Sequence, residues 1–489
     1  MSEKLDKDFL NKLIKKSKLT SDHLSPQGNL KIIYNLERSG QMEKALQQIE
    51  NLEFDLKFDS QVTKCRLLMC SGKLDESLLL SEDILPQIIE QEKKELELSL
   101  KTIEGLNYYY LNDFESVYEV ISNLQTMINN FTDQEVDKFH KPIAWYIMLR
   151  GYYLEAKGDL DESLEYLEQS LHLLKNQGYL YYESVVVGHI GRIYSTKGEI
   201  DTAMNKFSQE LEIAKRTKEF NRIARATLNL ASLNWRKNKI EKAYELYKES
   251  LKFSIESEND LYIAETLFDL ILISLENGME SKANYYMSEL EKYTKSSTNL
   301  EELTRCQITK AMILMSSTRM INRAKAQEIL TIAVNSDTVS QQLTIFAMQN
   351  LCVLLLEELQ LYGDSEVLFE INTLLESLSN IAKKQGSYVL EIEVLLLQAK
   401  VALLEGTGEN TVKFIKEAKD IAKNKHLDYL INKIDEIDKS MSDDIQKWML
   451  VFDSDSNLRD RVEKSKINEY LKDAIKLKNF LKDTSRSFS

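Results

Sequence analysis

Apolar positions along the chain recur with helical spacing, and short polar segments interrupt them at regular intervals. Four of these breaks contain Gly158, Gly198, Asn238 and Gly278, which lie forty residues apart. Glycine and asparagine suit such breaks because they readily adopt the left-handed backbone conformation that ends a helix. The pattern predicts pairs of amphipathic helices joined by tight turns over residues 143–292, with negligible strand content.

Columns of small and large residues accompany the four breaks. A small residue follows each break by five positions, a bulky residue follows it by nine, and a small residue precedes most breaks by seven. The columns are Ser163, Ala203, Ala243 and Ala283; Leu167, Phe207, Tyr247 and Met287; and Gly151, Gly191 and Ala231, with Ile271 as the exception. Small residues let two helix axes cross closely, and bulky ones fill the space beside the crossing. We therefore expect Ala203 and Ala243 to be buried where helices cross.

The segment VGHIGRIYSTKGEIDTAMNKFSQELEIAK, residues 187–215, resembles the tetratricopeptide repeat (TPR). The forty-residue step is similar to the longer-helix variety of kinesin light chains, Leu-Gly-Asn-type polarity adaptors and MalT-type regulators. This resemblance, clearest over 143–292, implies an all-α fold: an α-solenoid, a right-handed superhelix of helix–turn–helix repeats. The chain lacks a heptad coiled coil and has no room for nucleotide-binding or DNA-binding domains, so the specific tasks of those proteins are not implied.

The repeat pattern divides the chain into five expected parts. Residues 29–142 form irregular N-terminal repeats, 143–292 regular repeats and 293–439 degenerate helical repeats. Residues 1–28 and 440–489 are expected to be capping helices, because the open ends of a solenoid must be covered. The first of these carries Leu5, Phe9, Leu13 and Ile14, for which a membrane-surface helix is the alternative.

Composition supports a long helical protein and disfavours several functions. The 489 residues include only 3 Pro and 15 Gly, and 29% are charged, which suits amphipathic helices. The net charge of −15 has the wrong sign for a nucleic-acid binder. The charged N-terminus does not resemble a signal peptide, and no apolar run is long enough for membrane insertion. We expect a soluble, cytoplasmic protein.

Residues that carry chemistry are scarce. No phosphate-binding glycine loop is present, and none of the five histidines has another His or Cys at metal-ligand spacing. The four cysteines, Cys65, Cys70, Cys306 and Cys352, fit neither a zinc site nor a disulfide framework and are expected to be reduced, buried thiols. The sequence predicts no metal, no cofactor and no catalytic residues, so we expect a protein that is not an enzyme.

The TPR resemblance implies where a partner would bind, because the first helix of each repeat lines the concave wall of the superhelix. Asn229 occupies a position where TPR adaptors often use asparagine to hold the backbone of an extended peptide, and its amide can both donate and accept. Trp235 could offer an aromatic face beside it. The alternative is an exposed asparagine and a packed tryptophan.

Charge reverses locally in the same region. Between Lys215 and Lys239 eight basic residues accompany a single acidic one, Glu219, a local charge of +7. Basic side chains on a concave wall favour an acidic peptide or a carboxylate; the alternative is a solvated helix end paired with nearby glutamates. The expected partner-binding patch, with both arginines facing the groove, comprises Arg192, Arg225, Asn229, Ser232 and Trp235.

Three functions compete on this evidence. The first is a scaffold or adaptor that binds a peptide or protein segment, such as an acidic one, in the concave groove. The second is a ligand-sensing module that changes curvature when a small molecule or signalling peptide fills the groove, and the third is an enzyme. A deep apolar pocket with converging polar groups would favour the sensor, whereas an open groove would favour the scaffold.

Overall fold

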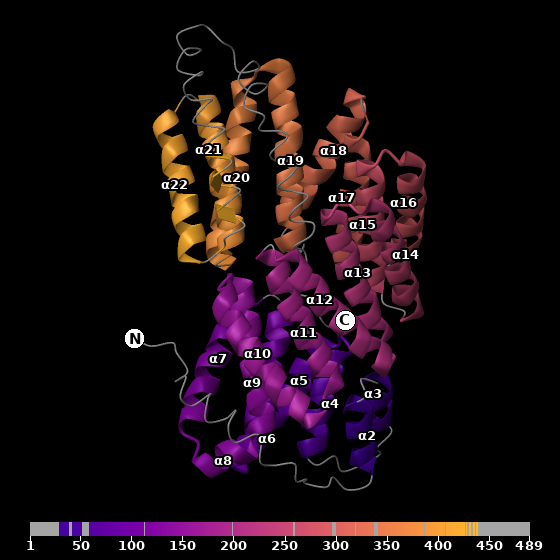
Figure 1. Cartoon of the computed structure of the whole chain (residues 1–489), viewed down its shortest axis with the longest axis vertical. Coiled ribbons are helices and arrows are strands. Elements are labelled where there is room, and N and C mark those ends of the chain that lie inside the picture. The colour runs from indigo at the N-terminus through magenta and orange to yellow at the C-terminus, as the bar shows by residue number, and fades with distance from the viewer. Residues whose placement is uncertain are drawn as a thin grey trace. The chain divides into compact units, whose positions relative to one another are not determined.

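The structure is a computed structural model of the whole chain (Figure 1). It describes residues 29–38, 42–50, 58–111, 113–197, 199–257, 260–295, 300–317, 319–336, 341–385, 387–405 and 407–425, with 427, 430–431, 434–435 and 437–438. These ranges are almost entirely helical and contain no strand. The all-α fold expected from the repeat pattern is confirmed.

The helices follow one another in pairs. The first helices of the pairs are α2 (Asn29–Arg38), α4 (Phe58–Cys70), α6 (Lys94–Tyr110), α9 (His140–Lys157), α11 (Leu180–Thr196), α13 (Phe220–Arg236), α15 (Asp260–Glu276), α17 (Leu300–Met315), α19 (Gln341–Tyr362) and α21 (Tyr388–Glu405). The second helices are α3 (Met42–Glu50), α5 (Leu74–Glu90), α7 (Phe114–Asn129), α10 (Leu160–Gln177), α12 (Ile200–Thr217), α14 (Ile240–Glu256), α16 (Glu280–Thr294), α18 (Met320–Val334), α20 (Ser365–Gln385) and α22 (Gly408–Asn424). The short α8 (Asp133–Lys138) lies between α7 and α9.

The turns within the regular pairs fall where the polar breaks predict them. Gly158, Asn238 and Gly278 have φ values of 83°, 55° and 66°, the left-handed conformation that ends a helix. Gly198 lies outside the described residues, but α11 ends at Thr196 and α12 begins at Ile200. The predicted alternation of helices over residues 143–292 is therefore confirmed.

Helix crossings explain the columns of small residues. Ala203 and Ala243 are completely buried, as predicted. A Cβ atom at Gly191 would lie 2.8 Å from the Phe207 ring, closer than real Cβ contacts, so the glycine is needed for α11 to approach α12. The small and bulky columns are thus the two sides of one contact within each helix pair.

A hydroxyl at the small position reinforces the crossing in several pairs. Ser163 Oγ donates to the Gly151 carbonyl oxygen at 2.7 Å. The same donation, from a hydroxyl to a carbonyl twelve residues earlier, joins Ser77 to Cys65 at 2.9 Å and Thr411 to Ala399 at 3.2 Å. Pairs in the irregular and degenerate parts of the chain therefore keep the geometry of the regular ones.

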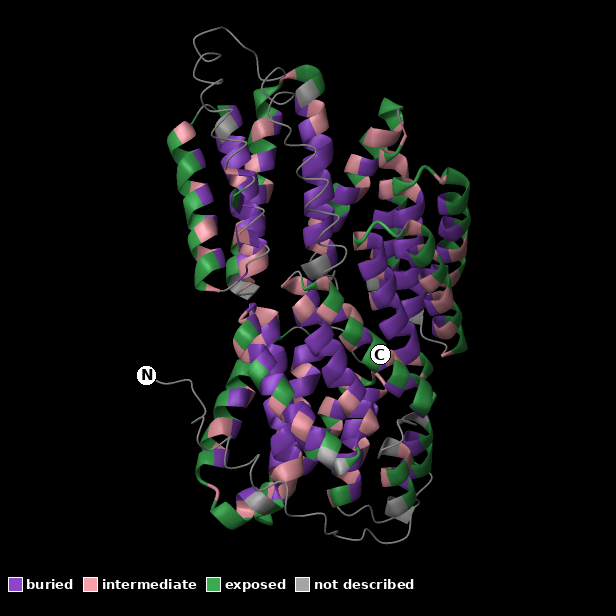
Figure 2. Cartoon of the chain, viewed as in Figure 1, coloured by how far each residue is buried: buried purple, intermediate pink, exposed green. Residues whose placement is uncertain are grey.

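The chain divides into two compact units, with the described residues up to Ala226 in the first and those from Thr227 in the second. In the first unit, α4, α6 and α9 each contact the next first helix, and α2 contacts α11. Cys70 Sγ consequently lies 3.6 Å from the Tyr182 hydroxyl, 112 residues later. Figure 2 shows that α9 and α11 are buried along most of their length, so these two first helices lie in the interior of the first unit.

The second unit has the same construction from its own helices. Its first helices α15, α17 and α19 contact one another in sequence, and the Phe268 and Phe346 rings meet edge to face at 5.5 Å. Ala326 and Leu330 are completely buried in α18, although this pair lacks most of the repeat signature. The degenerate repeats therefore still pack as helix pairs.

One set of predictions concerns residues that lie outside the described ranges. The expected capping helices at 1–28 and 440–489 fall there. The five-part division of the chain remains a prediction. Among the helices that the structure describes, none is long and apolar enough to cross a membrane.

Candidate functional site

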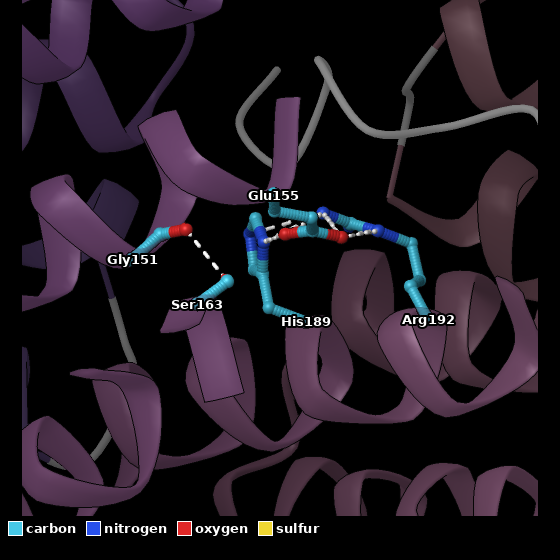
Figure 3. A network of polar contacts seen from close by, with 5 residues as sticks. All are labelled: Gly151, Glu155, Ser163, His189 and Arg192. Atoms are coloured by element: carbon cyan, nitrogen blue, oxygen red, sulfur yellow. Dashed lines mark hydrogen bonds and ion pairs between the residues drawn. The ribbon is translucent and has the colours of Figure 1, made fainter. Parts of the chain in front are cut away.

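Glu155, His189 and Arg192 meet in the interior of the first unit (Figure 3). Glu155 extends from α9 toward α11, which carries the other two residues one turn apart. Arg192 donates from Nε and Nη2 to the two carboxylate oxygens of Glu155, at 3.2 Å each. His189 Nδ1 lies 2.6 Å from Glu155 Oε2. The two helices are therefore joined by a bidentate ion pair that also holds an imidazole.

The short contact between Glu155 Oε2 and His189 Nδ1 requires one proton between the two atoms. Burial raises the pKa of Glu155 from 4.5 to about 7, although Arg192 opposes that rise. Burial, followed by the charges of Arg192 and Arg225, lowers the pKa of His189 well below 6.5. Below about pH 7 these opposite shifts place the shared proton on the Glu155 carboxyl group and leave His189 neutral, whereas above that pH Glu155 is the carboxylate of the ion pair with Arg192.

A second buried ion pair joins Glu210 of α12 to Arg222 of α13. Arg222 Nη2 donates to Glu210 Oε1 and, at 3.4 Å, to the Ser184 carbonyl oxygen. Gly188 of α11 leaves room for the carboxylate, because a Cβ atom there would lie 2.7 Å from Glu210 Oε2. Burial raises the pKa of Glu210, while the charge of Arg222 opposes the rise.

Tyr152 links the two ion pairs. Its ring stacks on the His189 ring with 3.6 Å between centroids, and the charges of both Arg192 and Arg222 act on its hydroxyl group. We refer to Tyr152, Glu155, His189, Arg192, Glu210 and Arg222 as the buried polar cluster. Its members come from α9, α11, α12 and α13 of the first unit, which the cluster therefore ties together.

Burial corrects one expectation about the predicted partner-binding residues. Arg192 and Arg225 were expected on an exposed groove wall, but their exposed fractions are only 7% and 2%. For Arg192 the cause is the adjacent helix α9, whose buried Glu155 forms an ion pair with it. Replacing these arginines with glutamate would therefore place uncompensated charge in a core and would not leave stability unchanged.

The other three predicted residues lie on the part of α13 that belongs to the second unit. Asn229 and Ser232 are partly exposed, whereas Trp235 is buried. Trp235 Nε1 donates to Glu276 Oε2 at 3.0 Å, and its ring meets the Tyr247 ring at 83° with 6.2 Å between centroids. Trp235 is therefore a packed tryptophan, as in one of the two interpretations left open by the sequence. Whether the five residues bind a partner stays a prediction.

The basic run between Lys215 and Lys239 also separates into two groups. Arg222 and Arg225 are buried in the first unit. The exposed members lie at the ends of α12 and α13 or in the turns that follow, and they are Lys215, Arg216, Lys218, Lys237 and Lys239. One part of the run therefore lies at solvated helix ends, and the other part is buried in the interior.

The sequence analysis singled out Arg192 but not its association with Glu155 and His189. Their separation of 34 and 37 residues is close to one repeat, which brings first-helix residues of adjacent pairs together. Glu210 was missed because it lies on a second helix, where a glutamate is expected to be solvated. The only local signal was Gly188, whose missing side chain makes room for it.

Comparison with known protein families assigns the chain to one of them. The model of the MalT-like TPR region matches residues 136–430, more than half of the chain. No curated protein sequence matches this chain. Within the part of the chain that the structure describes, no group of three His, Cys, Asp or Glu side chains is placed to hold a metal ion.

Several solved structures are similar in fold. A Rap protein complexed with competence and sporulation factor has 14% sequence identity and a TM-score of 0.49, over 81% of this chain and 98% of that one. The apo form of the quorum sensor NprR from B. thuringiensis has 14% identity and a TM-score of 0.47, over 74% of this chain and 98% of that one. At this level the likeness concerns the helical fold alone.

Proposed function

Because the chain belongs to the family of MalT-like TPR regions, we propose that it is a non-catalytic scaffold or adaptor that binds a peptide or protein segment through first helices of its repeats. The observation that carries this proposal is the accessible face of α13. From Arg222 to Trp235, Asn229 and Ser232 are the two positions of this helix that are not buried. Both are polar, and they lie three residues apart, so they share one face.

The chemistry of this face suits a peptide backbone. The Asn229 amide makes no hydrogen bond to the described part of the chain, so it can donate to a carbonyl and accept from an N–H of a partner. The Ser232 hydroxyl lies 3.0 Å from the Tyr247 hydroxyl, which fixes it next to the amide. In this proposal, Asn229 and Ser232 contact the partner, whereas Trp235, Arg192 and Arg225 hold their helices in place.

Charge favours an acidic partner segment. The exposed lysines at the ends of α12 and α13 are basic positions on a chain whose net charge is −15. Such charges increase the rate of encounter with an acidic segment and lose that effect as salt screens them. The acidic total disfavours nucleic acid as the partner. All four cysteines are buried free thiols, which supports a reducing, cytoplasmic location.

The test is a capture experiment from native cells with the full chain as bait. Asn229→Ala removes the amide from a partly exposed position, so stability should change by no more than about 0.5 kcal/mol. The matched control is Asn372→Ala, because Asn372 is also partly exposed but lies on a second helix, α20, where it donates to Glu405 Oε1 at 2.6 Å.

We expect Asn229→Ala to lose specific partners that the wild type and Asn372→Ala both retain. Recovery of those partners should also fall as salt is raised. If folded Asn229→Ala recovers every partner as well as the control does, the partner does not bind at α13 and this assignment is wrong.

A further inference from the structure

Three aromatic rings of the first unit surround one ammonium group. The distances from Lys141 Nζ to the ring centres are 5.1 Å for Tyr34, 5.0 Å for Trp145 and 4.9 Å for Tyr179. The rings come from three helix pairs, because Tyr34 lies on α2, Trp145 on α9 and Tyr179 directly before α11. The faces of aromatic rings attract cations at such distances. We refer to Tyr34, Trp145 and Tyr179 as the aromatic cage.

The Lys141 ammonium group finds rings around it but no acceptor for its protons. It makes no hydrogen bond and no ion pair with any residue that the structure describes. A primary ammonium has three N–H donors and is strongly hydrated, so a site lined by rings leaves its donors without protein partners. A quaternary ammonium has no N–H donor, and a cage of aromatic rings is the arrangement that recognises it. Lys141 therefore marks the position of a cation without being the cation that suits the cage best.

Part of the aromatic cage is accessible to solvent. Trp145 and Tyr179 are buried, whereas Tyr34 and Lys141 are partly exposed. The Lys141 side chain is a flexible stem, so it can leave the rings. Burial raises the pKa of Glu95, and nearby lysines, Lys141 among them, oppose the rise. The Glu95 carboxylate has no partner among the described residues, so it offers a displaced ammonium group a new one.

We propose that the aromatic cage is a binding site for a quaternary ammonium group, which displaces Lys141 from it. The cation belongs either to a small molecule of the choline type or to a trimethylated lysine side chain. The ring of Trp145 also carries the guanidinium group of Arg66, 4.6 Å from its centre. Arg66 is buried, so the ligand replaces Lys141 alone. This site is independent of the partner-binding face of α13, which lies in the second unit.

The test is ligand-observed NMR with the full-length chain. The probes are choline, the amide of Nα-acetyl-trimethyllysine, and the uncharged analogue of choline in which a tert-butyl group replaces trimethylammonium. Lys141→Ala empties the cage at a partly exposed position. It should bind the two cations roughly tenfold more tightly than the wild type does, because no tethered ammonium group competes. The uncharged analogue should bind roughly fivefold more weakly than choline, since it lacks the attraction between cation and ring.

Matched variants of Tyr34, made in the Lys141→Ala chain, separate the ring from the hydroxyl group. The Tyr34 hydroxyl lies 3.4 Å from Thr63 Oγ1, and Tyr34→Phe and Tyr34→Leu both remove this contact. Tyr34→Phe keeps a ring face and should keep the affinity. Tyr34→Leu removes the ring and should weaken binding of both cations roughly fivefold. Circular dichroism checks that both variants are folded.

The two cations distinguish the sources of the ligand. Binding of both shows that the ammonium group alone is recognised, whereas binding of one alone assigns the site to a small molecule or to a protein side chain. The proposal is overturned if neither cation binds Lys141→Ala, or if the wild type binds them equally tightly. It is also overturned if the uncharged analogue binds as well as choline, or if folded Tyr34→Leu and Tyr34→Phe have the same affinity.

Discussion

The proton shared by Glu155 and His189 predicts a pH dependence that is hidden in the wild type and revealed by substitution. The perturbations are Glu155→Gln and His189→Gln, each of which removes one titrating group from the pair. His172→Gln is the control, because His172 lies on α10, outside the buried polar cluster.

Whether stability rises or falls with pH depends on which state, folded or unfolded, binds more protons. Glu155 has a folded pKa of about 7 against 4.5, so the folded state binds its proton more tightly, and its contribution to stability falls as pH rises through this range. His189 has a folded pKa well below 6.5, so its contribution is present above 6.5 and is lost as pH falls. Between pH 4.5 and 6.5 the folded pair holds one proton on Glu155, and the unfolded chain holds one on the histidine. The contributions of Glu155 and His189 to the change of stability with pH therefore cancel.

Each substitution leaves one titrating group, so stability then changes with pH in one direction. In His189→Gln, stability should fall as pH rises from about 4.5 to about 7, by a total on the order of 3 kcal/mol if Glu155 keeps its pKa, since a tenfold change in an equilibrium is about 1.4 kcal/mol. In Glu155→Gln, stability should instead fall as pH is lowered below 6.5. Both substitutions also remove a buried contact. That loss lowers the free energy of unfolding at every pH but does not set how the free energy changes with pH.

The assay is urea unfolding followed by circular dichroism at several pH values and constant ionic strength, with hydrogen exchange of α9 and α11 amides to report on the first unit. The reasoning is refuted if the two variants change with pH in the same direction, or if both run parallel to the wild type and the His172→Gln control.

Two further predictions concern the helix crossings. Ala243→Leu forces three extra carbon atoms into a completely buried crossing and should lower the free energy of unfolding by roughly 1–3 kcal/mol. Lys242→Leu, at the adjacent exposed position, should not lower it. Equal thermal midpoints of the two variants would contradict the packing. Ser163→Ala removes the buried donor to the Gly151 carbonyl and should cost about 0.5–1.5 kcal/mol in urea unfolding, more than Ser208→Ala, whose exposed hydroxyl donates within its own helix.

Local features of the sequence were sufficient to predict the helix pairs and their turns. Gly158, Asn238 and Gly278 adopt left-handed backbone because few other residues do so without strain. Ala203 and Phe207 occupy the buried crossings because contacts within a helix pair join residues close in the sequence, and their spacing is fixed by helix geometry. These properties repeat at a constant step, which made them visible without a structure.

The candidate site could be predicted only in part. The face of α13 with Asn229 and Ser232 follows from helical spacing, and the structure leaves it accessible. Arg192 and Arg225 were placed on the correct helices, but their burial was not foreseen. The charge run gave no indication that two of its arginines are buried, because the sequence does not show which charges a neighbouring helix covers.

The sequence by itself thus determined the helices, the turns and the crossings within each pair, since these depend on residues a few positions apart. Tertiary structure alone decided how the first helices of successive pairs meet. In the first unit α9 and α11 bring Glu155 to Arg192, and the second helix α12 brings Glu210 to Arg222 of α13, so these charges lie in the interior. The contact between Glu155 and Arg192 joins residues that are 37 positions apart, so no local pattern in the sequence encodes it.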